Sequence, residues 1–256
     1  MSSNKEIFIN SSVAGNRIAI VENKELTELF IDTPEHRRMV GSIYKGRVQN
    51  VIPGMQAAFV DIGHDLNAFL PFSEIGNSDN LKNFSFDDSE QSKKINKNPK
   101  ETHNNLKIND NILVQVIKEP FSGKGARVTT DISIPGSLMV LVPNESYIGI
   151  SRKINDKYEK RRLRKIAEKI KPEGFGLIIR TIAGGLEEEI LKTDFDRIWK
   201  KWKDVESKTK SKKSPYPVYK DFDTSDQVIR DLFTSDIEGL YIDNKPIYKK
   251  IHKYRI

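Results

Sequence analysis

The chain has 256 residues, of which 43 are lysine or arginine and 36 are aspartate or glutamate, and its formal net charge of +7 favours a polyanionic partner such as nucleic acid. It has no cysteine, which excludes disulfides, thiolate zinc sites and cysteine nucleophiles and fits a reducing cytoplasm. No apolar run approaches the roughly 18 residues that a membrane-spanning helix requires, and the amino terminus lacks a signal-peptide core, so we expect a soluble, intracellular protein.

Residues 5–31 alternate short β-forming runs with turn residues. The runs IFIN, RIAIVEN and LTELFI are separated by Ala14-Gly15-Asn16 and by Glu22-Asn23-Lys24. This pattern predicts a three-stranded meander with a structural role.

Three further runs with strand composition follow at residues 43–51, 56–62 and 67–72. The first two are joined by IPGM, where proline and glycine predict a type II turn with its positive φ at Gly54, and Gly63-His64-Asp65 predicts the next reversal. Basic residues on the first run and phenylalanines on the next two are typical of a small barrel that stacks single-stranded nucleic acid on aromatic rings.

Residues 76–110 are rich in asparagine, lysine, serine and aspartate, and they predict a mobile loop between barrel strands. A metal site at His103 is not favoured, because no second ligand pair lies at useful spacing. Strand composition resumes at residues 112–117, and we expect the barrel to close by residue 125.

The next part of the chain predicts alternating strands and helices. Apolar runs at 138–142 and 176–181 predict buried strands. Residues 156–171 predict a helix that Asn155 or Asp156 caps, and its basic outer face is either solvated or in contact with RNA. In a second helix one apolar face is formed by Leu191, Phe195, Ile198, Trp202 and Val205.

Both tryptophans are interpreted as core residues rather than as a ligand platform. The segment 208–213 predicts a basic linker. A helix at 225–233, a strand at 237–242 and a terminal helix after Pro246 complete the expected elements.

The sequences IYKGRV, PGMQAAFVDIG and AFLPFSEI, within residues 43–75, resemble the RNA-binding OB barrel of the bacterial ribonuclease E and ribonuclease G family. The resemblance implies an α+β fold of several subdomains. Residues 1–35 and 214–256 would form a ribonuclease H-like α/β subdomain, cut short where the chain ends. A five-stranded OB-type barrel at 36–125 would be inserted into it, followed by a 5′-sensor α/β subdomain at 126–213.

In the barrel, the resemblance implies that Phe59 and Phe69 stack on RNA bases and that Lys118 and Lys124 neutralise the adjoining phosphates. The residues themselves leave a second possibility open. Both phenylalanines could belong to the barrel core, because AAFVDI is apolar on both faces.

A second site is implied by Gly136 in ISIPGS, Val140 in LMVL, and Arg180-Thr181 in IIRT, which match the 5′-sensor motif of the family. In that motif the terminal 5′-monophosphate of an RNA is bound, and Arg152 in ISRKI matches a basic position there. A guanidinium group donates two parallel hydrogen bonds to phosphate oxygens, and a hydroxyl adds a further donor. Glycine, which has no side chain, lets backbone amides come close to the phosphate. The alternative for Arg180 is an ion pair with one of the glutamates at 187–189.

The resemblance further implies a magnesium-dependent, single-strand-specific endoribonuclease of RNA processing and decay, which is cytoplasmic and a homo-oligomer at full length. The aspartates that hold Mg²⁺ in the family, and the cysteine motif that binds Zn²⁺ between protomers, correspond to positions beyond residue 256. We therefore expect this chain to contain no catalytic residue, to bind no metal or other cofactor, and to be inactive alone.

The carboxylates Asp61, Asp65 and Asp221–Asp223 are spaced like turn and cap residues rather than like a two-metal site. The expected partner is single-stranded RNA that carries a 5′-monophosphate. The alternatives are a stand-alone single-stranded RNA-binding module without nuclease activity and a barrel that prefers single-stranded DNA.

Overall fold

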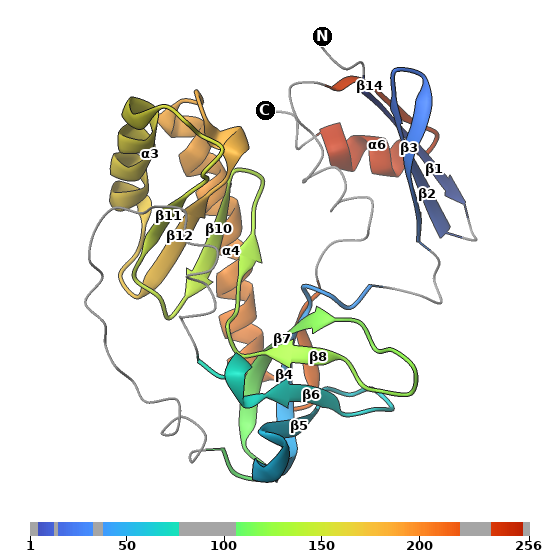
Figure 1. The fold of residues 1–256 in the computed structure, drawn as a ribbon, viewed down its shortest axis with the longest axis vertical. Helices are drawn as coiled ribbons and strands as arrows, with labels where there is room; N and C mark the ends of the chain where they lie inside the picture. Colours follow the sequence, from blue (N-terminus) through green and yellow to red (C-terminus); the bar gives the residue numbers. More distant parts are fainter. Residues whose placement is uncertain (1–4, 13–14, 33–37, 77–105, 221–236, 253–256) are drawn as a thin grey trace. The chain divides into compact units, whose positions relative to one another are not determined.

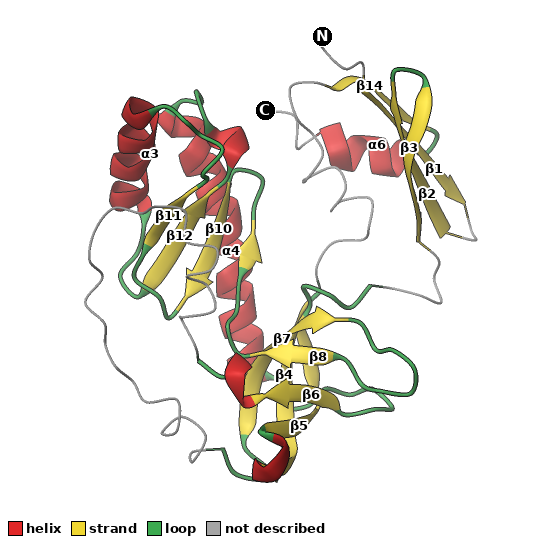
Figure 2. Ribbon diagram, viewed as in Figure 1, coloured by secondary structure: helices red, strands yellow, loops and turns green. Residues whose placement is uncertain are grey.

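The computed structural model describes residues 5–12, 15–32, 38–76, 106–220 and 237–252 (Figures 1 and 2). The chain divides into a terminal unit, residues 1–38 and 222–256, and a central unit, residues 39–221. The expected helix at 225–233 and most of the loop at 76–110, including His103, lie outside the described residues.

The terminal unit joins the two ends of the sequence in one four-stranded sheet of order β14-β1-β2-β3. Strands β1 to β3 form the predicted antiparallel meander, and β14 pairs with β1 in parallel. The elements are β1 (Lys5–Ser12), β2 (Gly15–Glu22), β3 (Glu25–Asp32), β14 (Ile237–Ile242) and α6 (Lys245–His252).

One face of this sheet is packed by α6, because Ile247 of the helix contacts a cluster that contains Ile7, Ile9 and Ile18. The predicted strand at 237–242 and the predicted terminal helix are therefore both present. Since the two ends of the chain share one sheet, the expected insertion of the intervening residues is confirmed.

The central unit contains a closed five-stranded barrel with the sheet order β4-β5-β6-β8-β7. The long strand β4 closes it, because residues 47–52 pair with β5 while residues 43–47 pair with β7. The strands are β4 (Ile43–Ile52), β5 (Ala57–Asp61), β6 (Ala68–Pro71), β7 (Asn111–Lys118) and β8 (Arg127–Thr129).

Two details of the barrel differ from expectation. The predicted type II turn is wrong: Pro53–Met55 form a 3₁₀ turn, and the positive φ belongs to Gln56, at 52°, rather than to Gly54. The fifth strand, β8, begins at Arg127, beyond the expected end at residue 125. Such a short strand has too few residues to show alternation, so only its pairing with β6 and β7 identifies it.

The second part of the central unit is a four-stranded sheet of order β11-β12-β10-β9, here called the sensor sheet because it carries the residues that were predicted for a 5′-sensor. Helix α3 packs on β11 and β12, and α4 packs on β10 and β9 (Figure 1). The elements are β9 (Ile134–Pro135), β10 (Met139–Pro143), β11 (Ile148–Ile150), α3 (Lys157–Ile170), β12 (Phe175–Ile179) and α4 (Glu188–Ser211).

In both helices the apolar residues are buried with the spacing that the sequence predicted. The Asp156 carboxylate caps α3 by accepting a hydrogen bond from the amide N–H of Tyr158 at 2.8 Å. All five residues predicted to form the apolar face of α4 are buried, including Trp202, and Trp199 packs partly buried against the same core. The tryptophans are therefore core residues.

The predicted linker at 208–213 is wrong, because α4 continues to Ser211. Lys45 of the barrel explains the extra length. Its ammonium donates hydrogen bonds to the carbonyls of Thr209 at 2.7 Å and Lys212 at 2.9 Å. A cation bound to the last carbonyls stabilises the end of a helix.

Strand β13 (Tyr216–Tyr219) then adds to the barrel by pairing with β4. The resemblance had grouped this segment with the ribonuclease H-like subdomain, whereas the structure includes it in the central unit. Val218 of β13 and Ile43 of β4 belong to the same hydrophobic cluster as the buried face of α4. The barrel and the sensor sheet therefore share one core.

Asp131 lies between β8 and β9, where the barrel leads into the sensor sheet. Its burial, together with the nearby carboxylates of Glu145 and Glu74, raises the pKa of its side chain to about 7. In the same cluster Tyr147 has a pKa raised to about 12, first by burial and then by Glu145 and Asp131. Asp131 is therefore a source of pH-dependent stability.

Between about pH 4 and about pH 7, folded Asp131 holds a proton that the unfolded chain has released, so the free energy of unfolding falls as pH rises across this range. We expect Asp131→Asn to lose this part of the pH dependence. The variant should also melt at a higher temperature than the unmodified chain at about pH 8, because its amide has no charge to desolvate. Thermal unfolding at several pH values measures both effects, and parallel pH profiles for the two proteins would contradict the assignment.

Candidate nucleic-acid interface

The two phenylalanines predicted for the barrel lie side by side on its outer surface. Phe59 of β5 and Phe69 of β6 are directly paired, with ring centroids 5.8 Å apart and ring planes inclined by 59°. Their neighbours along the strands, such as Ala58 and Leu70, are buried in the barrel core. Because successive side chains of a strand point to opposite faces, both rings point outward, and the core alternative is wrong.

Cross-strand register extends this pair into a row. Phe69 pairs with Arg127 of β8, which pairs with Lys118 of β7, and on the other side Phe59 pairs with Asn50 of β4. These five residues, one from each barrel strand, are here called the barrel row. Three of them, Phe59, Phe69 and Lys118, were predicted from the sequence, whereas Asn50 and Arg127 were not.

Two β-bulges determine which polar side chains lie in the barrel row. Val116 is a core residue of β7, and regular alternation would point Lys118 to the same side. A shift in register between Val116 and Lys118 instead places the lysine opposite Arg127. A similar shift between Val48 and Asn50 brings Asn50 beside Phe59. Each bulge re-aims a polar side chain towards the aromatic pair.

The barrel row is basic at one end. Arg127 Nη2 lies 2.9 Å from Glu74 Oε1, and this ion pair holds the guanidinium beside Phe69. Lys118 is exposed, and so is Lys124 in the connection between β7 and β8. The surface thus combines two aromatic faces with neighbouring cations, as single-stranded nucleic-acid sites do.

The residues of the second predicted site meet at one edge of the sensor sheet, here called the sensor edge. β11 runs parallel to β12, while β10 runs antiparallel to β12 and β9 antiparallel to β10. The carboxyl ends of β9, β11 and β12 therefore lie at the same edge. They are followed there by Gly136, by Ser151 with Arg152, and by Arg180 with Thr181.

Hydrogen bonds tie these residues together. Arg180 Nη1 donates to the Gly136 carbonyl at 3.2 Å, and the hydroxyls of Ser151 and Thr181 are 2.6 Å apart. Arg180 has an extended backbone and follows the buried Ile179, so it faces away from α3 and α4.

Val140 lies on this same face, because it pairs with Ile178, two residues before Arg180. The structure thus brings Gly136, Val140, Arg180 and Thr181 together, with the exposed Arg152 at the same edge. The alternative partners expected for Arg180 were the glutamates at 187–189. One of these, Glu188, forms an ion pair with Lys169, with 3.0 Å between Lys169 Nζ and Glu188 Oε2.

A buried carboxylate, which was not predicted from the sequence, binds the backbone next to this edge. Asp194 of α4 is only 3% exposed, and it accepts hydrogen bonds from the backbone amides of Ser137 at 3.1 Å and Leu138 at 2.8 Å. It approaches Gly136 so closely that a Cβ there would lie 2.7 Å from Asp194 Oδ2 and 2.4 Å from Ile198 Cδ1. The available signal was a lone carboxylate on the apolar face of α4, three residues after Leu191.

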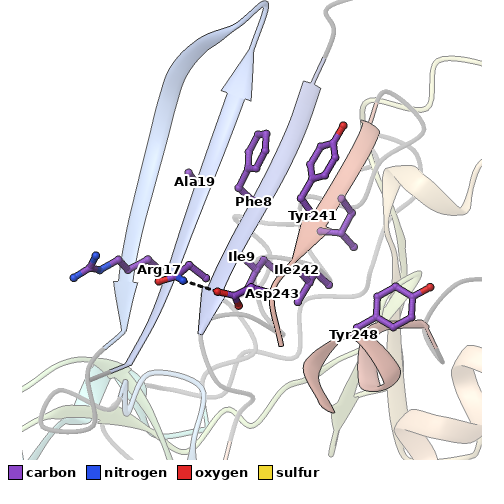
Figure 3. A pocket seen from close by; sticks show the side chains of 10 residues that line it. Phe8, Ile9, Arg17, Ala19, Tyr241, Ile242, Asp243 and Tyr248 are labelled. Carbon is purple, nitrogen blue, oxygen red and sulfur yellow. Dashed lines mark hydrogen bonds between the residues drawn. The ribbon is translucent and has the colours of Figure 1, made fainter. Parts of the chain in front are cut away.

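The terminal unit contains a hollow that is separate from both predicted sites (Figure 3). Phe8 and Tyr241 stack there on neighbouring strands, with ring centroids 4.7 Å apart, and Asn10 donates a hydrogen bond to Asp243. None of the residues that line it belongs to the barrel row or to the sensor edge.

Among the described residues, no group of three or more histidines, cysteines or carboxylates could hold a metal ion. Within the same ranges, no helix is both long and apolar enough to cross a membrane.

Residues 133–255 match the ribonuclease E/G family, and residues 37–120 match the S1 RNA binding domain. Ribonuclease G of Salmonella typhimurium (strain SL1344) is 33% identical over 255 residues, which covers 97% of this chain and 50% of that protein. Ribonuclease G of Haemophilus influenzae is 35% identical over 253 residues, covering 97% of this chain and 49% of that protein. Ribonuclease E of a Nostoc species is 33% identical over 237 residues, covering 92% of this chain and 32% of that protein. The chain thus spans about half the length of the ribonuclease G relatives it matches.

Asp194→Ala should destabilise the central unit, because two amides near the sensor edge lose a charged acceptor. We expect a loss of about 2–4 kcal/mol in the free energy of unfolding, measured by urea denaturation. Asp196→Ala, on the exposed face of the same helix, is the matched control and should change the value by no more than about 0.5 kcal/mol. Equal losses in the two variants would show that the buried carboxylate has no special role.

Proposed function

Because the chain belongs to the ribonuclease E/G family and carries an S1 RNA-binding domain, we propose that it is the part of a single-strand-specific endoribonuclease that holds RNA and senses its 5′ end. The barrel row is the observation that carries this proposal. It presents Phe59 and Phe69 together on the outside of an RNA-binding domain, where rings of this size have no packing role in the core.

On the barrel, bases stack on the two phenylalanine rings, and each stacked base contributes roughly 1–3 kcal/mol of binding free energy. Lys118 and Lys124 neutralise neighbouring phosphates, which makes the affinity depend on salt concentration. Every base has an aromatic face, so this surface binds single strands with little regard to sequence. A duplex keeps its bases stacked on one another and is bound less well.

At the sensor edge, Arg180 and Thr181 bind the terminal 5′-monophosphate of the RNA. The Gly136 carbonyl orients the guanidinium, and the Ser151 hydroxyl orients that of Thr181. A guanidinium and a hydroxyl held in this way donate to phosphate oxygens with little loss of side-chain freedom. Val140 supplies an apolar wall on the same face, and Arg152 adds positive charge at the edge.

Binding at one site raises the effective concentration of the RNA at the other, because both belong to the same unit. In the whole protein, this arrangement would deliver single-stranded RNA to a magnesium-dependent hydrolytic centre during RNA processing and decay in the cytoplasm. For the whole protein we propose this magnesium centre, a Zn²⁺ ion bound between protomers, and a homo-oligomeric state. The described residues contain no group fit to hold a metal, and no hydrolytic step is assigned to them.

The combined variant Phe59→Ala, Phe69→Ala should bind single-stranded RNA of any sequence at least about tenfold more weakly, because two stacking faces are lost. It should remain folded, because both rings lie outside the barrel core. Fluorescence anisotropy with labelled RNA measures the affinity, and circular dichroism measures folding. Met55→Ala removes an exposed apolar side chain from a barrel turn and should bind as the unmodified chain does. If the double variant is unfolded, the two rings are part of the barrel core and the proposed stacking site is wrong.

Arg180→Ala should abolish the preference for 5′-monophosphorylated over 5′-hydroxyl RNA, a preference of about 10- to 100-fold for a charge-assisted hydrogen-bonding site. Binding through the barrel should persist. Competition between two RNAs that differ only at the 5′ end measures the preference, and Arg197→Ala, an exposed arginine of α4, is the control. If the unmodified chain binds both ends equally, the sensor proposal is wrong while the barrel proposal stands.

A further inference from the structure

Phe121, in the connection between β7 and β8, is the most exposed large hydrophobic residue in the described part of the chain, with 81% of its surface accessible. Single exposed apolar side chains are common on protein surfaces, so exposure alone assigns no role. The backbone that carries this ring is more informative.

Phe121 and Lys124 form a tight hairpin. The amide of Phe121 donates to the Lys124 carbonyl at 3.2 Å, and the amide of Lys124 donates to the Phe121 carbonyl at 3.0 Å. Ser122 and Gly123 between them have φ values of 50° and 73°, as in the two-residue turns that suit β-hairpins. Residues that exchange both hydrogen bonds are directly opposite, and their side chains share a face. The ring and the ammonium group therefore project from the same side of the hairpin.

The first arm of the hairpin is fastened to the barrel. It leaves β7 at Lys118, and the carboxylate of Glu119 accepts hydrogen bonds from the amides of Met39 at 2.8 Å and Val40 at 2.9 Å. In the segment 118–127, Glu119 is the one carboxylate, beside Lys118, Lys124 and Arg127. The segment therefore carries a net positive charge.

The second arm is fastened beside the barrel row. The Ala126 carbonyl accepts a hydrogen bond from the amide of Phe69 at 2.8 Å. Gly125 lies so close to the chain at Asn67 that a Cβ would come within 2.0 Å of the Asn67 carbonyl oxygen. The hairpin thus begins at one member of the barrel row, Lys118, and ends against the strand that carries another, Phe69.

From this geometry we propose that Phe121 and Lys124 form a nucleotide subsite that extends the barrel row, in which a base of single-stranded RNA stacks on Phe121 and its phosphate is bound by Lys124. The subsite rests on the RNA-binding function proposed above and adds a third stacking ring to it. A ring on a two-residue turn that is fastened at both ends loses little conformational freedom on binding, so the stacking energy is retained as affinity.

The test measures binding of the full 256-residue chain to a labelled single-stranded RNA of about 12 nucleotides, a length within the range that one OB barrel covers. Phe121→Ala should weaken binding by about 5- to 100-fold, whereas Phe121→Trp should keep the affinity. The Trp variant should also lose fluorescence when RNA binds, beyond any change in the unmodified chain. Tyr158→Ala, which removes an 80% exposed ring from α3, is the matched control and should bind normally.

Salt dependence separates the two roles within the subsite. Phe121→Ala should leave the slope of log affinity against log salt unchanged, because the ring neutralises no phosphate. Lys124→Ala should reduce that slope by about 0.7, the value for one phosphate contact with a single strand.

If the unmodified chain binds RNA and Phe121→Ala binds it equally well, the subsite is wrong although the proposed function survives. If the unmodified chain does not bind RNA, the proposed function is wrong and the subsite is overturned with it.

Discussion

The packing of α4 holds the sensor edge in place and joins it to the barrel that carries the barrel row. The apolar face of this helix shares one core with the sensor sheet, and that core also includes Ile43 and Val218 from the barrel strands. Near its amino end, Asp194 holds the backbone at Ser137 and Leu138, while Lys45 of the barrel binds the carbonyls at its carboxyl end. One helix thus fixes the sensor edge and ties it to the domain that carries the barrel row.

The two sites use different physics, which suits the two tasks proposed for them. The stacking proposed for the barrel row would depend on a feature that every base possesses, so it would give affinity without sequence preference. The recognition proposed for the sensor edge would depend on charge and on donor geometry, so it would discriminate between chemical ends of the same RNA. The first task tolerates a sliding strand, whereas the second requires side chains held in place, as Arg180 is by the Gly136 carbonyl.

Most elements could be predicted because their patterns are local. Asp156 caps α3, and the helical spacing from Leu191 to Val205 gives the buried face of α4. Apart from the local turn at Pro53–Met55, the errors occur where a distant segment decides the outcome. The end of α4 depends on Lys45, and strands β8 and β13 are recognisable only from their pairing with other strands.

From the sequence alone we could predict a barrel with two phenylalanines on neighbouring strands, and the family motifs grouped Gly136, Val140, Arg180 and Thr181. The packed strands were needed to show that Phe59 and Phe69 face outward and that a bulge brings Lys118 to the same face. They also show that Arg127 lies between Phe69 and Lys118 in the cross-strand register. Likewise, Asp194 and Gly136 meet across 58 residues of sequence only because α4 packs on the sensor sheet. Side-chain direction in a strand depends on register, and register is set by partners that no local pattern contains.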